Sequence, residues 1–281
     1  MDKKHLLTSK SFIELNARER AISLLDAGSM RELIGPFDRV KSPWLEQQGI
    51  VTQADDGMVV AKGTIDGAPA VILAIEGSFQ GGSLGEVAGA KMAGALELAA
   101  EDNRKGIPIR AVLLLETGGV RLQEANLGLA AIAEIHAAIA DLRRYQPVIA
   151  VVAGTVGCFG GMSVAAALCS YLVVTREARV GLNGPQVIEQ EAGIDEYDSR
   201  NRPFIWSFSG GEQRVKTGLA DRYVPDDVES MSQTVRELCA LGVPASHRDE
   251  RVTEFLDLLK RVDTTQQAES AAVRATFGKE L

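Results

Sequence analysis

The sequence predicts an α/β protein in which strand–helix units follow one another along the chain. Three continuous apolar runs, residues 69–75, 107–115 and 147–152, each lead into a pair of glycines and then into a helical pattern. Continuous apolar strands that alternate with helices are typical of sheets covered on both faces. Because the three segments differ in sequence, we interpret them as repeated supersecondary units and not as a solenoid.

A helix and a hairpin are expected before the first full unit. Residues 12–34 mix apolar and charged side chains and are predicted to be helical, with Gly28 as the stop. Residues 59–64 and 69–76 are predicted strands. Asp66-Gly67 lies between them and is a strong hairpin signal.

The remaining elements alternate in the same way toward the end of the chain. Their positions are predicted from hydrophobic periodicity and from the glycines and prolines at their ends. The sequence predicts helices at 84–102, 122–144, 162–169, 185–191 and 211–218, strands at 171–175 and 179–182, and a helical apolar stripe at 252–261.

Composition excludes several classes of protein. The 281 residues are 46% hydrophobic and 24% charged, which is ordinary for a globular chain, and the net charge of −8 argues against a nucleic-acid partner. Three cysteines without a CxxC pattern argue against a disulfide framework and a four-cysteine zinc site, and no metal-ligand spacing occurs. With no apolar run near the roughly 18 residues of a membrane span and no signal-peptide pattern at the start, we expect a cytoplasmic protein without a membrane partner.

The glycine pairs between strands and helices are the main functional signal. They are Gly81-Gly82, Gly118-Gly119 and Gly160-Gly161. Such a pair lets a ligand approach the backbone and leaves N–H groups free at a helix start, where the helix dipole adds positive charge. The arrangement suits a phosphate, a carboxylate or a developing oxyanion. The absence of GxxxxGK[ST] and GxGxxG argues against the common nucleotide-binding loops.

A serine hydrolase is a minor alternative. Gly81-Gly-Ser-Leu-Gly85 matches the G-x-S-x-G nucleophile elbow, and His247 lies downstream as a base. Ser83 with Glu86 also matches a capping box, which would give the serine a structural role. His136 lies in an Ala- and Ile-rich helix, and we interpret it as structural.

Few other residues offer proton-transfer chemistry. Three glutamates, Glu76, Glu116 and Glu124, lie near the glycine turns. They could act as catalytic acids and bases. We favour a structural role, in which they cap helices or form ion pairs with Lys91 and Arg121. This inventory fits a reaction that needs mainly enolate stabilisation.

Three stretches resemble the carboxyltransferase branch of the crotonase-like superfamily. They are residues 79–87, residues 117–125, and Gly160-Gly161 followed by residues 184–190; residues 17–32 also resemble the start of such domains. The resemblance covers about residues 12–228. It implies a single-domain crotonase-like fold of stacked β-β-α units, with a helical extension at 1–50, the core at 51–228 and a helical segment at 229–281.

Within that branch, the chain is most similar to the β subunits of biotin-independent malonate decarboxylases. It lacks the four-cysteine zinc ribbon of bacterial acetyl-CoA carboxylase β subunits, and its length holds one crotonase-like domain where fused carboxyltransferases have two. The stretches that carry this similarity are 35–39, 42–45, 124–128, 157–161, 181–185 and 210–214.

That resemblance implies a heteromeric enzyme that decarboxylates malonyl-S-acyl carrier protein to the acetyl thioester and CO2. The implied partners are a γ subunit, the acyl carrier protein with its CoA-like phosphopantetheine group, and a malonate:acyl carrier protein transferase. No directly bound cofactor and no biotin are expected. A carboxyltransferase subunit of a biotin-dependent enzyme and a non-catalytic scaffold domain remain alternatives.

The resemblance also implies the site. An oxyanion hole would combine the N–H of Gly160 or Gly161 with that of Gly119 or Val120. Cys158 beside it is interpreted as a small buried residue. The residues implied to bind substrate are Phe79, Gly81, Gly82, Gly118, Arg121, Gln123, Phe159 and Gly184.

Overall fold

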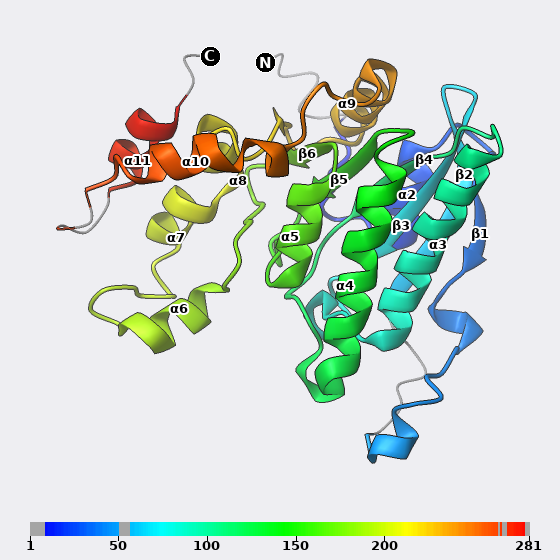
Figure 1. Cartoon of the computed structure of the whole chain (residues 1–281), viewed down its shortest axis with the longest axis horizontal. Helices are drawn as coiled ribbons and strands as arrows, with labels where there is room; N and C mark the ends of the chain where they lie inside the picture. Colours follow the sequence, from blue (N-terminus) through cyan, green and yellow to red (C-terminus); the bar gives the residue numbers. More distant parts are fainter. Residues whose placement is uncertain (1–8, 51–56, 264, 266–268, 279–281) are drawn as a thin grey trace.

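The computed structural model describes residues 9–50, 57–263, 265 and 269–278. These residues contain a seven-stranded sheet in the order β1 to β7 (Figure 1). The first three strands pair antiparallel and the later ones pair parallel. The strands are β1 Arg31–Ile34, β2 Met58–Ile65, β3 Ala68–Ile75, β4 Arg110–Leu114, β5 Val148–Val152, β6 Tyr171–Val174 and β7 Arg222–Tyr223.

The predicted hairpin joins β2 and β3. Ile65 pairs with Ala68, so the turn consists of Asp66 and Gly67. Both turn residues have positive φ, at 50° and 73°. A two-residue turn with two positive φ values matches the right-handed twist of the strands, which explains the Asp-Gly sequence.

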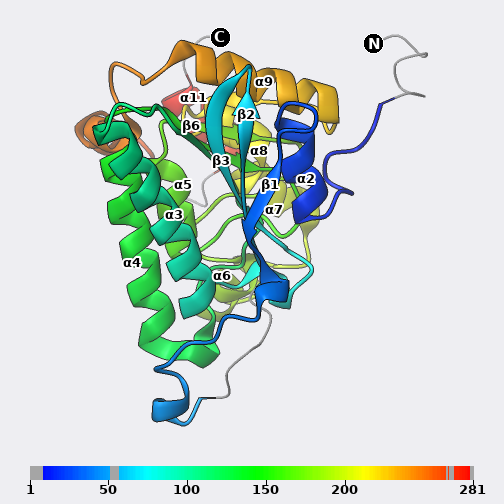
Figure 2. The same cartoon turned by 90° about the vertical axis from the view of Figure 1, so that its right-hand side faces the viewer.

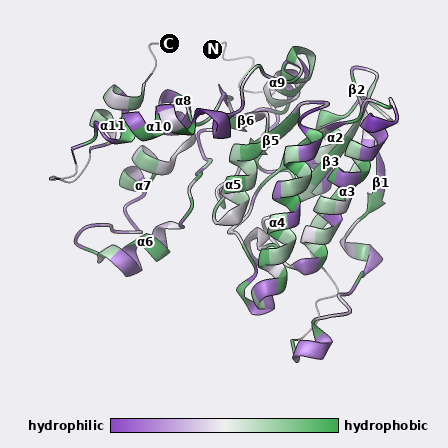
Figure 3. Cartoon of the chain, viewed as in Figure 1, coloured by the Kyte–Doolittle hydropathy of each residue, from purple (hydrophilic) through white to green (hydrophobic). Residues whose placement is uncertain are grey.

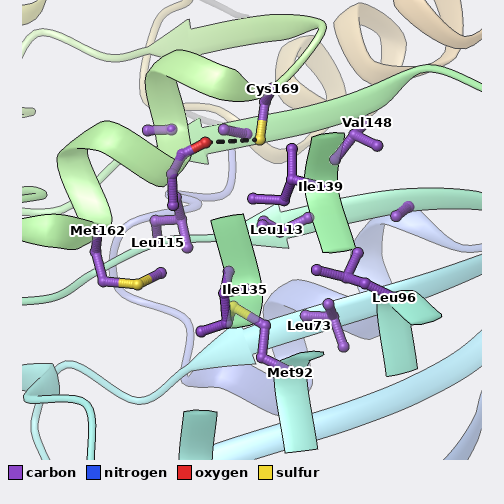
Figure 4. Close-up of a cluster of buried hydrophobic side chains, with 14 of the residues drawn as sticks. Leu73, Met92, Leu96, Leu113, Leu115, Ile135, Ile139, Val148, Met162 and Cys169 are labelled. Atoms are coloured by element: carbon purple, nitrogen blue, oxygen red, sulfur yellow. Dashed lines mark hydrogen bonds between the residues drawn. The ribbon is translucent and has the colours of Figure 1, made fainter. Parts of the chain in front are cut away.

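The three predicted strand–helix units are confirmed. Helix α3 (Glu86–Arg104) follows β3, α4 (Ala125–Leu142) follows β4, and α5 (Gly161–Leu168) follows β5. The three helices lie side by side on one face of the sheet (Figures 1 and 2). Their apolar faces and the strands enclose the larger core, where Met92 and Leu96 lie beside Leu73 (Figure 4).

A second core fills the other face of the sheet. Helices α2 (Ala17–Leu24) and α9 (Val228–Leu241) pack there (Figure 2). Phe12, Leu24 and Leu238 are fully buried against this face. Because both faces are covered, the central strands are almost entirely hydrophobic, as Figure 3 shows.

The last part of the chain is mainly helical. Helices α6 (Pro185–Ala192) and α7 (Arg202–Ser209) stand apart from the sheet (Figure 1), and α8 (Gly211–Lys216) returns to it. Helices α10 (Val252–Leu259) and α11 (Ser270–Phe277) follow α9. The bidentate ion pair of Arg143 with Asp249, at 2.7 Å, ties this segment to the end of α4.

Two sequence predictions need correction. The helix expected over residues 12–34 ends at Leu24, and Arg31–Ile34 is strand β1. Asp26 explains the difference, because its carboxylate accepts hydrogen bonds from Thr64 and Gly67 of the hairpin and so turns the chain toward the sheet edge. The strand expected at 179–182 is reduced to isolated bridges, such as that of Val180 with Cys158.

Among the described residues, Leu122–Leu142 is the one helical stretch long and apolar enough to cross a membrane by length and composition. Its residues Ile132, Ile135 and Ile139 are buried in the larger core. A buried apolar helix of this length is typical of the core of a globular domain.

Candidate active site

Three glycine-containing loops meet beyond the carboxyl ends of β3, β4 and β5. The N–H of Gly118 donates to the carbonyl of Gly81 at 2.9 Å, and the N–H of Leu84 donates to Gly119 at 2.8 Å. On the other side, Phe159 donates to Thr117 at 3.1 Å. The backbone therefore joins the three predicted glycine turns into one continuous surface.

The middle and third loops lie close together, and the positive φ angles at their contact favour glycine. A Cβ on Gly119, where φ is 108°, would lie 3.2 Å from the carbonyl oxygen of Phe159. Gly160 has φ 60°, and its Cβ would lie 3.4 Å from the Cα of Gly119 and 4.0 Å from the nitrogen of Val120. A side chain at Gly160 would therefore enter the space between the two loops.

The hydrogen bonds distinguish the four candidate donors. Gly160 donates its N–H to the carbonyl of Leu182 at 2.7 Å, and Gly119 donates to the Thr117 hydroxyl at 3.0 Å. Within the described parts of the chain, the N–H groups of Gly161 and Val120 have no acceptor. Both residues are partly exposed, and we interpret their N–H groups as the candidate donors to a ligand.

Gly161 is the first residue of α5, and its position is fixed by a neighbouring helix. His136 on α4 places its Nε2 2.7 Å from the Gly161 carbonyl oxygen. Since the carbonyl accepts, Nε2 carries the proton. The sequence assigned His136 a structural role but gave no sign of this contact, because the two residues lie on different helices.

Arg121 holds the first loop in place. It is 3% exposed, and its guanidinium donates to the Ser83 carbonyl at 3.0 Å and to Glu124 at 3.1 Å. It also lies 5.5 Å from the centre of the Phe79 ring. These contacts occupy the side chain within the protein, although the resemblance implied that Arg121 and Phe79 bind substrate.

The capping box predicted for Ser83 and Glu86 is wrong. The residue before α3 is Gly85, and the Glu86 N–H donates to the carboxylate of Glu124 at 2.6 Å. The Ser83 hydroxyl instead accepts a 3.3 Å hydrogen bond from Arg121. A carboxylate supplied by the next loop does the capping, which the local S-x-x-E pattern does not reveal.

A surface hollow of about 500 Å3 opens beside Val120. Gln123 lines it and is exposed, and the neighbouring Leu122 is 81% exposed. The hollow therefore brings ligand-sized space to one of the two unpaired N–H groups. Two of the implied substrate-binding residues, Arg121 and Gln123, line this space.

Two other predicted residues, Gly82 and Phe159, pack where neighbouring loops meet. A Cβ on Gly82 would lie 1.8 Å from the Glu116 carbonyl oxygen, so Gly82 permits close packing of two loops. Phe159 is 6% exposed and packs under Arg179. Gly184 precedes α6, and a Cβ there would meet no atom within 4 Å.

The carboxylates near the turns have structural partners, as we favoured, although the ion-pair partner of Glu116 is Arg20 and not Lys91 or Arg121. Glu116 forms a buried ion pair with Arg20 at 2.5 Å and accepts from the N–H of Val156 at 3.1 Å. Glu76 accepts from the N–H of Ala17 at the start of α2. These contacts connect the N-terminal helix to the loops.

The thiol of Cys158 is a buried core group. Its side chain is 0% exposed, and burial raises the pKa of the thiol far above its ordinary value. The thiol is therefore neutral at physiological pH, which is the wrong state for a nucleophile.

The geometry does not assemble a serine triad. His136 contacts Gly161, and His247 lies 3.5 Å from the hydroxyl of Ser170. Neither of these two histidines is among the hydrogen-bond partners of Ser83 in the described structure.

A stacked α/β core whose three strand–helix units bring their glycine loops together at one edge of the sheet is typical of the crotonase-like class of proteins. The sequence profile of the carboxyl transferase domain matches residues 14–267, and the chain belongs to this family. The predicted fold class is thereby confirmed.

Individual known proteins show which members of the family the chain resembles. It is 68% identical to a chain of a Pseudomonas malonate decarboxylase hetero-tetramer solved with malonate, with a TM-score of 0.93 over 98% of this chain and 100% of that one. It is 36% identical to the malonyl-S-ACP:biotin-protein carboxyltransferase of Malonomonas rubra, over 98% of this chain and 91% of that protein. A transcarboxylase 12S chain is 26% identical, with a TM-score of 0.66, over 84% of this chain and 42% of that one. The predicted resemblance to malonate decarboxylase is confirmed.

Proposed function

We propose that this chain is the β subunit of a malonate decarboxylase and that it stabilises the enolate formed when malonyl thioester loses CO2. The observation that carries the proposal is the pair of unpaired N–H groups on Gly161 and Val120, presented by adjoining loops. The 68% identity to a malonate decarboxylase chain supports the choice of reaction.

The chemistry follows from where charge develops. When the malonyl carboxylate leaves as CO2, the electron pair of the broken C–C bond moves into the thioester, and its oxygen becomes an enolate. Two N–H donors aimed at that oxygen stabilise the transition state more than the substrate. One such donor typically contributes about 3 kcal/mol. The dipole of α5 adds to this effect at Gly161.

The remaining requirements belong to partners. A solved Pseudomonas malonate decarboxylase is a hetero-dimer, and this chain is 60% identical to a chain of it, with a TM-score of 0.78 over 92% of this chain and 100% of that one. We infer that a γ subunit holds the departing carboxylate opposite the glycine loops. The thioester would arrive on the phosphopantetheine group of an acyl carrier protein, loaded by a malonate:acyl carrier protein transferase. We assign the complex to the cytoplasm and expect no biotin.

Carboxyl transfer to biotin is the second candidate. The Malonomonas relative carries that activity in its name, and the enolate site would serve both reactions. The two differ in the acceptor of the carboxyl group and not in the stabilisation of the enolate.

The deciding experiment supplies the assembled complex with malonyl-S-acyl carrier protein and measures acetyl thioester and CO2. We expect equal amounts of both products and no effect of avidin, which sequesters biotin. Product formation that requires a biotinylated protein would favour carboxyl transfer. Turnover of neither kind would contradict the proposed function.

A further inference from the structure

A second hollow, of about 660 Å3, lies beside the loop that leads to Gly160 and is lined by three arginines. Arg176 and Arg179 follow strand β6, and Arg202 begins helix α7. Thr155, at the start of the loop, lines the same hollow. Segments distant in the sequence thus bring three positive charges to one concave surface.

Among the described residues, these charges are only partly compensated. In the described part of the structure, none of the three arginines has a carboxylate within 4.0 Å. Glu177 contributes one negative charge to the lining, and its Oε2 is buried without a hydrogen-bond partner. Glu212 acts on Arg176 only through longer-range attraction. Three cations and one anion leave the lining with an excess of two positive charges.

Arg179 is held rigidly in this environment. Its guanidinium donates to the Thr155 carbonyl at 2.5 Å and lies 4.5 Å from the Trp206 ring centre and 5.5 Å from that of Phe159. Its Nε is buried and has no hydrogen-bond partner. Burial, followed by repulsion from Arg202, lowers the pKa of Arg179. The fold therefore keeps a desolvated cation near a like charge, an arrangement that a bound anion would stabilise.

We propose that this arginine hollow binds a small multivalent oxyanion, the class that includes phosphate groups and dicarboxylates. Planar guanidinium groups match the oxygen spacing of both kinds of anion and bind them with two parallel hydrogen bonds. Arg179 is already oriented by stacking, so little side-chain entropy is lost on binding. The excess of two positive charges selects a dianion over a monoanion.

The site is separate from the unpaired N–H groups of Gly161 and Val120. Its lining residues lie in the 176–206 segment and at Thr155, outside the turns at 81–85 and 118–121. The proposal therefore does not rest on the decarboxylation reaction. Binding alone tests it, and a failure would leave the proposed function untouched.

Isothermal titration calorimetry on the assembled complex, with inorganic phosphate, malonate and acetate as probes, provides the test. We expect phosphate or malonate to bind here and acetate to bind at least about tenfold more weakly. Arg202→Gln and, independently, Arg176→Gln should weaken binding about tenfold or more. Comparing the affinities for phosphate and malonate identifies which kind of anion the hollow binds. Malonate binding that is unchanged in both variants occurs at another site and does not support the proposal.

Arg200→Gln is the matched control. Arg200 is exposed two residues from Arg202, but it is paired with Asp198 at 3.2 Å and does not line the hollow. It should leave binding unchanged, and circular dichroism should show that all three variants are folded. Equal weakening by Arg200→Gln, or no binding of either dianion that depends on Arg202 or Arg176, would overturn the proposal. Binding to the isolated chain that disappears in the complex would also overturn it and would assign the arginines to carboxylates of a partner subunit.

Discussion

The imidazole Nε2 of His136 lies 2.7 Å from the carbonyl oxygen of Gly161 and so connects the middle of helix α4 to the first turn of α5. Gly161 also carries one of the two unpaired N–H groups. A histidine outside the glycine loops therefore anchors the residue that carries a proposed oxyanion donor. We infer that His136 acts as a positioning residue.

Replacing His136 should affect rate more than substrate affinity. We expect His136→Leu to lower kcat about tenfold, because small misplacements of a catalytic group are costly, while KM changes little. His136→Gln retains an N–H donor of similar reach and should recover most of the rate. Steady-state kinetics of the assembled complex give both parameters. If His136→Leu left kcat unchanged and only lowered the melting temperature, His136 would have a structural role alone.

Ser83→Ala should be nearly silent. The hydroxyl accepts one long hydrogen bond from Arg121, which retains its contacts with the Ser83 carbonyl and Glu124. We expect turnover within about twofold of the original and a stability loss of about 1 kcal/mol or less. A folded Ser83→Ala variant without turnover would revive the hydrolase mechanism.

Cys158→Ala should retain activity and lose some stability. Because burial raises the pKa of the thiol, the thiolate is not populated near neutral pH, and the rate should show no dependence on its ionisation there. Removing the buried sulfur should cost about 1–2 kcal/mol in unfolding free energy. Loss of turnover in a folded variant, or rapid alkylation of Cys158 by iodoacetamide in the native protein, would contradict this interpretation.

The isolated chain should decarboxylate malonyl thioester poorly or not at all. Its loops offer donors for the enolate oxygen, whereas the departing carboxylate must be held by the γ partner. Turnover measured before and after addition of that partner tests the expectation. Full activity of the chain alone would show that the site is complete without an interface.

The sequence predicted the fold well where local patterns and tertiary packing agree. The apolar strands and the Asp66-Gly67 turn formed as expected, because buried parallel strands need continuous hydrophobic residues and the two-residue turn needs positive φ. The predictions failed where a distant contact decided the outcome. Asp26 redirects the N-terminal segment, and Glu124 takes the capping role assigned to Ser83.

For the candidate site, the sequence indicated pairs of residues, and their role stays a prediction. Sequence spacing identified the glycine turns, but it left open Gly160 against Gly161 and Gly119 against Val120. Those choices depend on which N–H groups already have acceptors, and the acceptor of the Gly160 N–H is Leu182, more than twenty residues away. Such pairings arise only when the loops meet in the folded chain.

The most direct test of the proposed oxyanion hole is the turnover of malonyl-S-acyl carrier protein by a complex that carries Gly160→Ala. The added Cβ would lie between the loops, 4.0 Å from the nitrogen of Val120, and φ at this position is unfavourable for alanine. Gly94→Ala is the matched control, because Gly94 lies in α3 and a Cβ there meets nothing within 4 Å. We predict that Gly160→Ala assembles with its partner but loses about 10²-fold or more in rate, while Gly94→Ala keeps its rate. A folded, assembled Gly160→Ala complex with near-normal turnover would contradict the account.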